Sequence, residues 1–180
     1  IKRKDVLDSI VNILASSVGS LTNPANIYKT YISSGDKDIS INTITSYIEY
    51  LENAFLINKV NRYDVKGRRY ISTPFKYYYT DIGLRNARLN FRQQEENHLM
   101  ENIIYNELRL RGYQVDVGVV VKRDRTKEGV QEKKQLEIDF VANKGSKRYY
   151  IQSAFSLPDA EKLKQEKASL NSVTDSFKKI

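Results

Sequence analysis

Several residue types are absent or scarce in this 180-residue chain, and each absence narrows what the protein can do. There is no cysteine, which excludes a disulfide framework and thiolate metal sites and fits a reducing cytoplasm. The single histidine, His98, argues against a hydrolase triad or a zinc centre. The 8 glycines are scattered, and no Gly-rich loop leads into the Lys-Ser/Thr pair that binds ATP phosphates. No apolar run approaches the roughly 20 residues of a membrane span.

Basic residues are in excess, with 30 Lys and Arg against 22 Asp and Glu and a formal net charge of +8. This charge is compatible with a nucleic-acid partner. The excess is spread evenly, since residues 1–97 hold 14 basic and 10 acidic residues and residues 98–180 hold 16 and 12. A mixed basic surface is therefore an equally good reading. The chain begins at Ile1 with no signal-peptide pattern, and we expect part of a longer cytoplasmic protein without a membrane partner.

The first half of the chain predicts three helices followed by a hairpin. Apolar residues at helical spacing predict a helix over 5–17, a short one follows Asn23-Pro24, and Ser40 is a suitable N-cap for the third. Strands over 55–63 and 76–80 flank a turn at residues 66–69. This order is that of a winged helix-turn-helix, and we place the domain boundaries at 1–90 and 91–180.

A winged helix commonly reads DNA with its third helix, but this third helix is a poor candidate. From Ile39 to Asn58 there is no Lys or Arg, whereas phosphate contacts supply most non-specific affinity. The turn carries the candidate nucleic-acid-binding residues Lys66, Arg68 and Arg69. Packing or protein contact is the alternative use of this domain, and we favour it.

The second half predicts a helix over 94–111, a strand over 113–121, a charged loop over 122–134, a strand pair over 136–142 and 148–155, a helix over 158–169 and a final strand. Residues two apart in a strand share a face, so Glu137 and Asp139 should point the same way. Gln152 and Ala154 form the matching pair on the next strand. Two carboxylates on one face call for a cation, an ion pair or solvent.

From His98 to Ile180 this order resembles the PD-(D/E)XK nuclease fold, a mixed sheet flanked by helices. The resemblance implies that Glu101 is the helix carboxylate and Asp139 the metal-binding aspartate. Residues Tyr150 to Ala154 match the strand that normally reads Ile-Glu-Val-Lys, but Gln152 replaces the second carboxylate and Ala154 the lysine. The resemblance thus implies an α+β chain of two domains whose second domain is degenerate and C-terminally incomplete.

The whole chain resembles the C-terminal half of a large prokaryotic family of AAA-type ATPases of poorly defined role. The resemblance rests on Tyr-Tyr-Xaa-Thr-Asp-Xaa-Gly-Leu, which begins at Tyr77 and continues through Tyr78 to Leu84, and on Glu-Asn-Ile-Ile-Tyr-Asn-Glu-Leu at Glu101 to Leu108. In that family an N-terminal half binds ATP, so ATP is expected only outside this chain, which then has no cofactor of its own. The resemblance also implies that one partner of this chain is the ATPase domain of the same full-length protein.

Three functions follow from these observations. The first is a non-catalytic accessory region of an AAA-type ATPase that binds a protein partner or nucleic acid, in which case this part is no enzyme. The second is a Mg²⁺-dependent nuclease that holds the metal with Glu101, Glu137 and Asp139, with Gln152 offering an amide oxygen. The third is a winged-helix DNA-binding regulator. Tyr77-Tyr78-Tyr79 and Tyr149-Tyr150 could stack bases, although tyrosine also suits strand surfaces.

Overall fold

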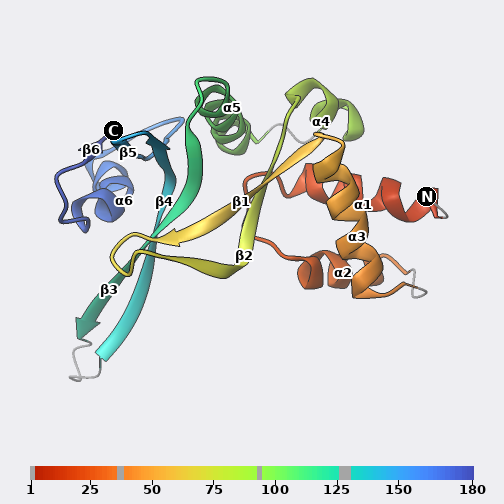
Figure 1. The fold of residues 1–180 in the computed structure, drawn as a ribbon, viewed down its shortest axis with the longest axis horizontal. Coiled ribbons are helices and arrows are strands. Elements are labelled where there is room, and N and C mark those ends of the chain that lie inside the picture. Colours follow the sequence, from red (N-terminus) through yellow and green to blue (C-terminus); the bar gives the residue numbers. More distant parts are fainter. Residues whose placement is uncertain (1–2, 36–38, 93–94, 126–130) are drawn as a thin grey trace. The chain divides into compact units, whose positions relative to one another are not determined.

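The computed structural model describes residues 3–35, 39–92, 95–125 and 131–180. Within these ranges the chain is an α+β protein with six helices and a six-stranded mixed sheet (Figure 1). The helices are α1 (Lys4–Ser16), α2 (Pro24–Ser33), α3 (Ile41–Asn53), α4 (Ile82–Arg88), α5 (Glu96–Leu110) and α6 (Ala160–Asn171). The strands are β1 (Ile57–Asp64), β2 (Arg69–Tyr79), β3 (Gln114–Arg125), β4 (Gln131–Lys144), β5 (Lys147–Ile151) and β6 (Lys178–Lys179).

The chain divides into two compact units. The first comprises Ile1–Val60 and Thr73–Ile103, and the second comprises Asn61–Ser72 and Ile104–Ile180. The sequence predicted one boundary between residues 90 and 91. The division of the folded chain differs from it, because the turn end of the β1–β2 hairpin and the C-terminal part of α5 belong to the second unit.

The first unit is built on α1, α2 and α3, close to the predicted bounds. Asn23 accepts a hydrogen bond from the Asn26 backbone at 2.8 Å, and Ser40 accepts one from the Thr43 backbone at 3.2 Å, so both predicted N-terminal signals act as caps. The apolar faces of the three helices form the core, which includes Val6, Ile10, Leu14, Ile27, Ile44, Ile48 and Leu51.

The three tyrosines that end β2 belong to this core. Tyr77, Tyr78 and Tyr79 are only 2%, 0% and 1% exposed, so they cannot stack against nucleic-acid bases. The sequence patterns did not predict α4, which begins after Asp81, whose carboxylate accepts a hydrogen bond from the Leu84 backbone at 2.9 Å. Helix α4 carries the buried Arg85, whose Nε donates to the Ala15 carbonyl at 2.8 Å.

The strand order of the sheet is β2-β1-β3-β4-β5-β6 (Figure 1). Strands β3 to β6 lie wholly in the second unit, whereas β1 and β2 each have one part in either unit. Strands β3, β4 and β5 pair antiparallel, whereas β1 with β3 and β5 with β6 pair parallel. The parallel β1–β3 pair was not predicted, because the hairpin was assigned wholly to the first domain. The predicted charged loop over 122–134 was also wrong: β3 and β4 continue into it as a long hairpin, and residues 126–130, Gly129 among them, lie outside the described residues.

A β-bulge interrupts β4 at the predicted carboxylate pair. Asp116 pairs with Val141 and Gly118 pairs with Ile138, so two residues of β4 lie opposite Val117 alone. Gly118 is required here, since a Cβ at that position would lie 2.9 Å from side-chain atoms of both Ile138 and Val141. Strict alternation therefore fails between Ile138 and Val141, which both join the buried cluster that includes Leu170 and Val173.

Strand β5 ends at Ile151, so Gln152 and Ala154 follow the strand instead of lying within it. Helix α6 begins after Asp159, whose carboxylate accepts a hydrogen bond from the Lys162 backbone at 2.7 Å. The predicted final strand is confirmed as β6, a two-residue strand. Across the described part of the chain, no helix combines the length and the apolar character needed to cross a membrane.

Candidate functional site

Asp139, the predicted metal ligand, lies in the bulge of β4 and is 6% exposed. Its Oδ2 accepts two hydrogen bonds from Ser153, one from the backbone N–H and one from the hydroxyl, each at 2.7 Å. These two bonds join β4 to the segment that leaves β5. They give this buried carboxylate the partners that a buried charge requires.

Gln152 and Ala154 are the residues that the sequence resemblance aligned with the carboxylate and the lysine of a nuclease site. The Gln152 amide nitrogen donates to a Glu166 carboxylate oxygen at 3.2 Å, and its amide oxygen accepts a hydrogen bond from the Ser169 hydroxyl at 3.3 Å. Glu166 and Ser169 both belong to α6. Gln152 thus ties its segment to this helix, and the Ala154 methyl group offers no charge.

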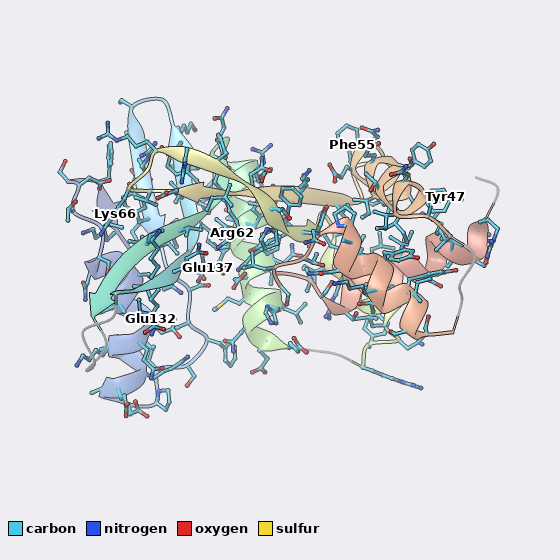
Figure 2. All side chains as sticks on the ribbon, turned by 90° about the horizontal axis from the view of Figure 1, so that it is seen from below. Tyr47, Phe55, Arg62, Lys66, Glu132 and Glu137 are labelled. Carbon is cyan, nitrogen blue, oxygen red and sulfur yellow. The ribbon has the colours of Figure 1, made fainter. Side chains whose placement is uncertain are left out.

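Glu101 lies on the part of α5 that belongs to the first unit. Its Oε2 accepts hydrogen bonds from Lys76 Nζ at 3.0 Å and from the Tyr78 hydroxyl at 2.8 Å. The side chains of Lys76 and Glu101 are 4% and 13% exposed, so this ion pair is largely buried. Glu137 is a half-buried residue of β4 (Figure 2). Among the residues that the structure describes, no three Asp, Glu, His or Cys side chains are grouped as a metal ion would need.

Two of the three predicted nucleic-acid-binding residues lie beside a cleft in the second unit. Its volume is about 630 Å³, and its lining includes Tyr63, Lys66, Arg68, Arg148, Asp175 and Phe177. Lys66 lies at the turn end of the β1–β2 hairpin, beyond Arg62 (Figure 2). The third predicted residue, Arg69, has its Nε 3.9 Å from the Asp64 carboxylate and is not part of the lining.

The hairpin turn that carries Lys66 and Arg68 is held on both sides. The Asp64 carboxylate accepts a hydrogen bond from the Gly67 backbone at 2.9 Å, an Asx-type turn. The Val65 backbone N–H donates to the Val119 carbonyl at 3.0 Å and so continues the pairing with β3. Arg68 has a φ of +51°, the left-handed conformation that closes the turn. The two cations therefore project from a defined turn.

Arg148, on β5, is the third cation of the cleft. Its Nε donates to the Asn143 side-chain oxygen at 2.7 Å, which fixes the guanidinium. The guanidinium carbon lies 5.5 Å from the centre of the Tyr63 ring and 5.2 Å from that of Phe177, within cation–π range of both. Burial acts to lower the pKa of Arg148, but hydrogen bonds and charge interactions with Tyr150 and Tyr63 outweigh it and raise the pKa.

The one carboxylate in the lining, Asp175, has two donors of its own. It accepts a hydrogen bond from the Tyr150 hydroxyl at 2.5 Å and one from the Phe177 backbone at 3.2 Å. Burial, followed by the bond to Asp175, raises the pKa of Tyr150 to about 12, so Tyr150 remains a donor at neutral pH.

Sequence reasoning missed Tyr63, Arg148 and Phe177 as cleft residues. They come from three separated segments, which the sheet and the loop after α6 bring together. The parallel pairing of β1 with β3 brings the hairpin turn into this unit. Local sequence patterns do not predict such a long-range pairing. The repeated Arg and Lys around Gly67 were the only available indication.

Comparison with known proteins identifies a family. The family described as "Domain of unknown function (DUF8612)" matches residues 1–95. An uncharacterised protein of Haemophilus influenzae is 36% identical over 180 residues, which is 100% of this chain and 41% of that protein. An uncharacterised protein of Methanocaldococcus jannaschii is 28% identical over 177 residues, 97% of this chain and 36% of that protein. No solved structure matches. The chain thus spans 41% and 36% of the lengths of these relatives.

Proposed function

Since the chain belongs to the DUF8612 family, we propose that it is a non-catalytic binding region of a longer prokaryotic protein whose other part is an AAA-type ATPase. The two relatives described above come from a bacterium and an archaeon, and each is more than twice as long as this chain. That additional length leaves room for the ATP-binding half that the sequence resemblance implies. In this proposal the chain contributes a winged-helix unit and a degenerate nuclease-like unit, both used for binding.

The pair of hydrogen bonds from Ser153 to Asp139 carries the proposal. In the nuclease family this aspartate holds a metal ion, but here its Oδ2 takes both the backbone N–H and the hydroxyl of Ser153. Gln152 likewise makes contacts with α6, through Glu166 and Ser169. These side chains therefore do not fit a Mg²⁺ site, which calls for several oxygen ligands converging on one point. They fit a structural role that fastens the end of β5 to β4 and α6.

The alternative of an active nuclease has less support. It requires Glu101, Glu137 and Asp139 to act together on one metal ion. Glu101 is engaged in a buried ion pair with Lys76, and the Tyr78 hydroxyl takes the same carboxylate oxygen. Ala154 supplies no amine to stabilise the negative charge that develops during phosphodiester hydrolysis.

The order of α1, α2 and α3 followed by the β1–β2 hairpin supports the winged-helix assignment of the first unit. Helix α3 has no Lys or Arg, and its Glu49 is exposed, so insertion into a DNA groove is disfavoured. Tyr50 and Phe55, at the C-terminal end of this helix, are 52% and 81% exposed. Exposed aromatic side chains are enriched in protein interfaces, and we infer that this end of α3 contacts protein.

The test compares two substitutions of Asp139. An asparagine keeps an oxygen that accepts both Ser153 bonds, whereas an alanine removes it. For a structural aspartate, Asp139→Asn retains most of the stability and Asp139→Ala loses it. The same proteins are incubated with single- and double-stranded DNA and RNA in Mg²⁺ or Mn²⁺, and we expect no cleavage above the buffer control. Metal-dependent cleavage by the wild type that both substitutions abolish contradicts the proposal.

A further inference from the structure

We propose that the cleft between the hairpin turn, β5 and the loop after α6 binds a phosphorylated nucleoside, either free or as a unit of a single-stranded nucleic acid. This inference rests on the proposed function in one respect: it takes the chain to act by binding, and it names the ligand. The cleft combines three cations, Lys66, Arg68 and Arg148, with the aromatic rings of Tyr63 and Phe177.

The charge of the cleft favours an anion. Lys66 and Arg68 are exposed and stand on a turn that Asp64 and Val65 hold in place, so little reorganisation is needed for them to meet a phosphate. Asp175 is the one acidic residue in the lining, and it already accepts hydrogen bonds from Tyr150 and the Phe177 backbone. The donors around Asp175 offset its repulsion of a phosphate, and the three cations outnumber it.

The aromatic walls favour a planar group attached to that anion. Phe177 is 40% exposed, and together with Tyr63 it flanks the Arg148 guanidinium. An exposed ring that lies against a guanidinium fixed at Nε forms the kind of platform on which an unpaired base stacks. Bases in a duplex have no free face, so the platform selects a free nucleotide or a single strand. An acidic peptide would use the cations and leave the platform unused.

The size of the cleft is appropriate. Its volume of about 630 Å³ lies in the range of roughly 300 to 1,000 Å³ that small-molecule and cofactor sites occupy. Lys66 and Arg68 lie on the turn and Arg148 on β5, so a phosphate and a base can be contacted from different sides.

The experiment is a fluorescence anisotropy titration of the full 180-residue chain with labelled oligo(dT) and oligo(U) of eight nucleotides, in EDTA so that no metal-dependent cleavage can occur. Unlabelled dTMP and UMP are then used as competitors. Effective competition identifies a mononucleotide site, and weak competition identifies a site for a strand. Either result supports the proposal, because both ligands present the same phosphorylated nucleoside.

The matched variants are Lys66→Gln/Arg68→Gln in the cleft and Lys133→Gln/Lys134→Gln on β4, outside the lining. Both pairs remove two positive charges from exposed positions. We expect the cleft pair to weaken oligonucleotide binding at least tenfold and the β4 pair less than threefold. The cleft pair should also reduce the slope of log K against log[salt] by roughly 1.4, since each phosphate that a protein neutralises on a single strand adds about 0.7 to that slope.

A further variant, Phe177→Leu, tests the platform. It should weaken oligonucleotide binding about tenfold, which is near the lower end of the loss expected when one base no longer stacks on an aromatic ring. The slope of log K against log[salt] should stay unchanged, because no charge is removed. Equal weakening of oligonucleotide binding by the cleft pair and the β4 pair overturns the proposal. The proposal is also overturned if neither the oligonucleotides nor the mononucleotides bind when they are present in 100-fold excess over the protein. Such a failure can be told apart from a failure of the proposed function. The latter appears as cleavage of DNA or RNA in the presence of Mg²⁺ or Mn²⁺, which cannot occur in this assay because it contains EDTA.

Discussion

The side-chain amide of Asn102 forms two hydrogen bonds with the backbone of Tyr79. The Tyr79 N–H donates to Asn102 Oδ1 at 2.8 Å, and Asn102 Nδ2 donates to the Tyr79 carbonyl at 2.7 Å. Both residues are buried, and the amide pairs with the strand end as a neighbouring strand would. The adjacent Tyr78 hydroxyl bonds to Glu101 at 2.8 Å. The two sequence segments that carry the ATPase-family resemblance therefore meet in one structural contact.

We expect Asn102→Ala to destabilise the first unit by about 2 to 4 kcal/mol, because it leaves a buried N–H and a buried carbonyl without their partner. Urea unfolding, followed by circular dichroism, measures the change. Asn42→Ala is the matched control, since Asn42 is an exposed residue of α3. A difference below about 0.5 kcal/mol between the two variants would rule out a structural role for the Asn102 amide.

Glu101 should be a stability residue of the first unit. Glu101→Gln removes the charge partner of the buried Lys76, and we expect a loss of about 3 kcal/mol or more. The double variant Lys76→Met/Glu101→Gln removes both charges and should regain most of that loss. Unfolding free energies of the two variants provide the comparison. Equal stability of Glu101→Gln and the wild type contradicts this reading and would make Glu101 available for another role.

Tyr150 gives the second unit an alkaline pH dependence. Its pKa is raised to about 12 in the folded protein, against about 10 in an unfolded chain, chiefly by burial and also by Asp175. The stabilising contribution is complete below about pH 10 and is lost as the pH rises toward 12, because the unfolded chain releases the proton first. Guanidinium unfolding midpoints at pH 8, 10 and 11 should fall more steeply for the wild type than for Tyr150→Phe. Tyr28→Phe, which removes a hydroxyl in the first unit, should keep the wild-type slope.

Phe55 follows the C-cap of α3 with a φ of +56°, a conformation that glycine adopts more easily. Its ring is 81% exposed, so little burial is lost when it is removed. We expect Phe55→Gly to stabilise the first unit by about 0.5 to 1 kcal/mol and Phe55→Ala, which keeps a Cβ, to give no gain. Thermal unfolding distinguishes them. A ring retained at a strained and exposed position agrees with a role in contacting a partner.

The local elements could be predicted from the sequence to a large extent. Asn23 and Ser40 cap helices as predicted, and the strand pair around Gly145 is present as β4 and β5. Local signals suffice in these places because caps and turns depend on neighbouring residues. Helix α4 was missed although Asp81 and Leu84 form a capping contact, since the stretch is short and ends among polar residues.

The tertiary relationships could not be predicted in the same way. The bulge at Asp139 depends on contacts of Gly118 with Ile138 and Val141, twenty residues and more along the chain. The Ser153 bonds to Asp139 depend on where β5 ends. The cleft depends on the parallel pairing of β1 with β3. The bulge, the Ser153 bonds and the cleft all depend on which distant strands become neighbours. The spacing of apolar residues along the sequence does not determine which strands pair.

We propose that Asp139 binds Ser153 in place of a catalytic metal ion. Calorimetric titration of Mg²⁺ and Mn²⁺ into the wild-type chain, with Asp139→Asn as the control, tests it most directly. We predict no saturable heat in either protein and similar unfolding temperatures for the two. Saturable binding to the wild type that disappears in Asp139→Asn, a variant that keeps an acceptor for Ser153, would show that Asp139 is a metal ligand and would overturn its structural assignment.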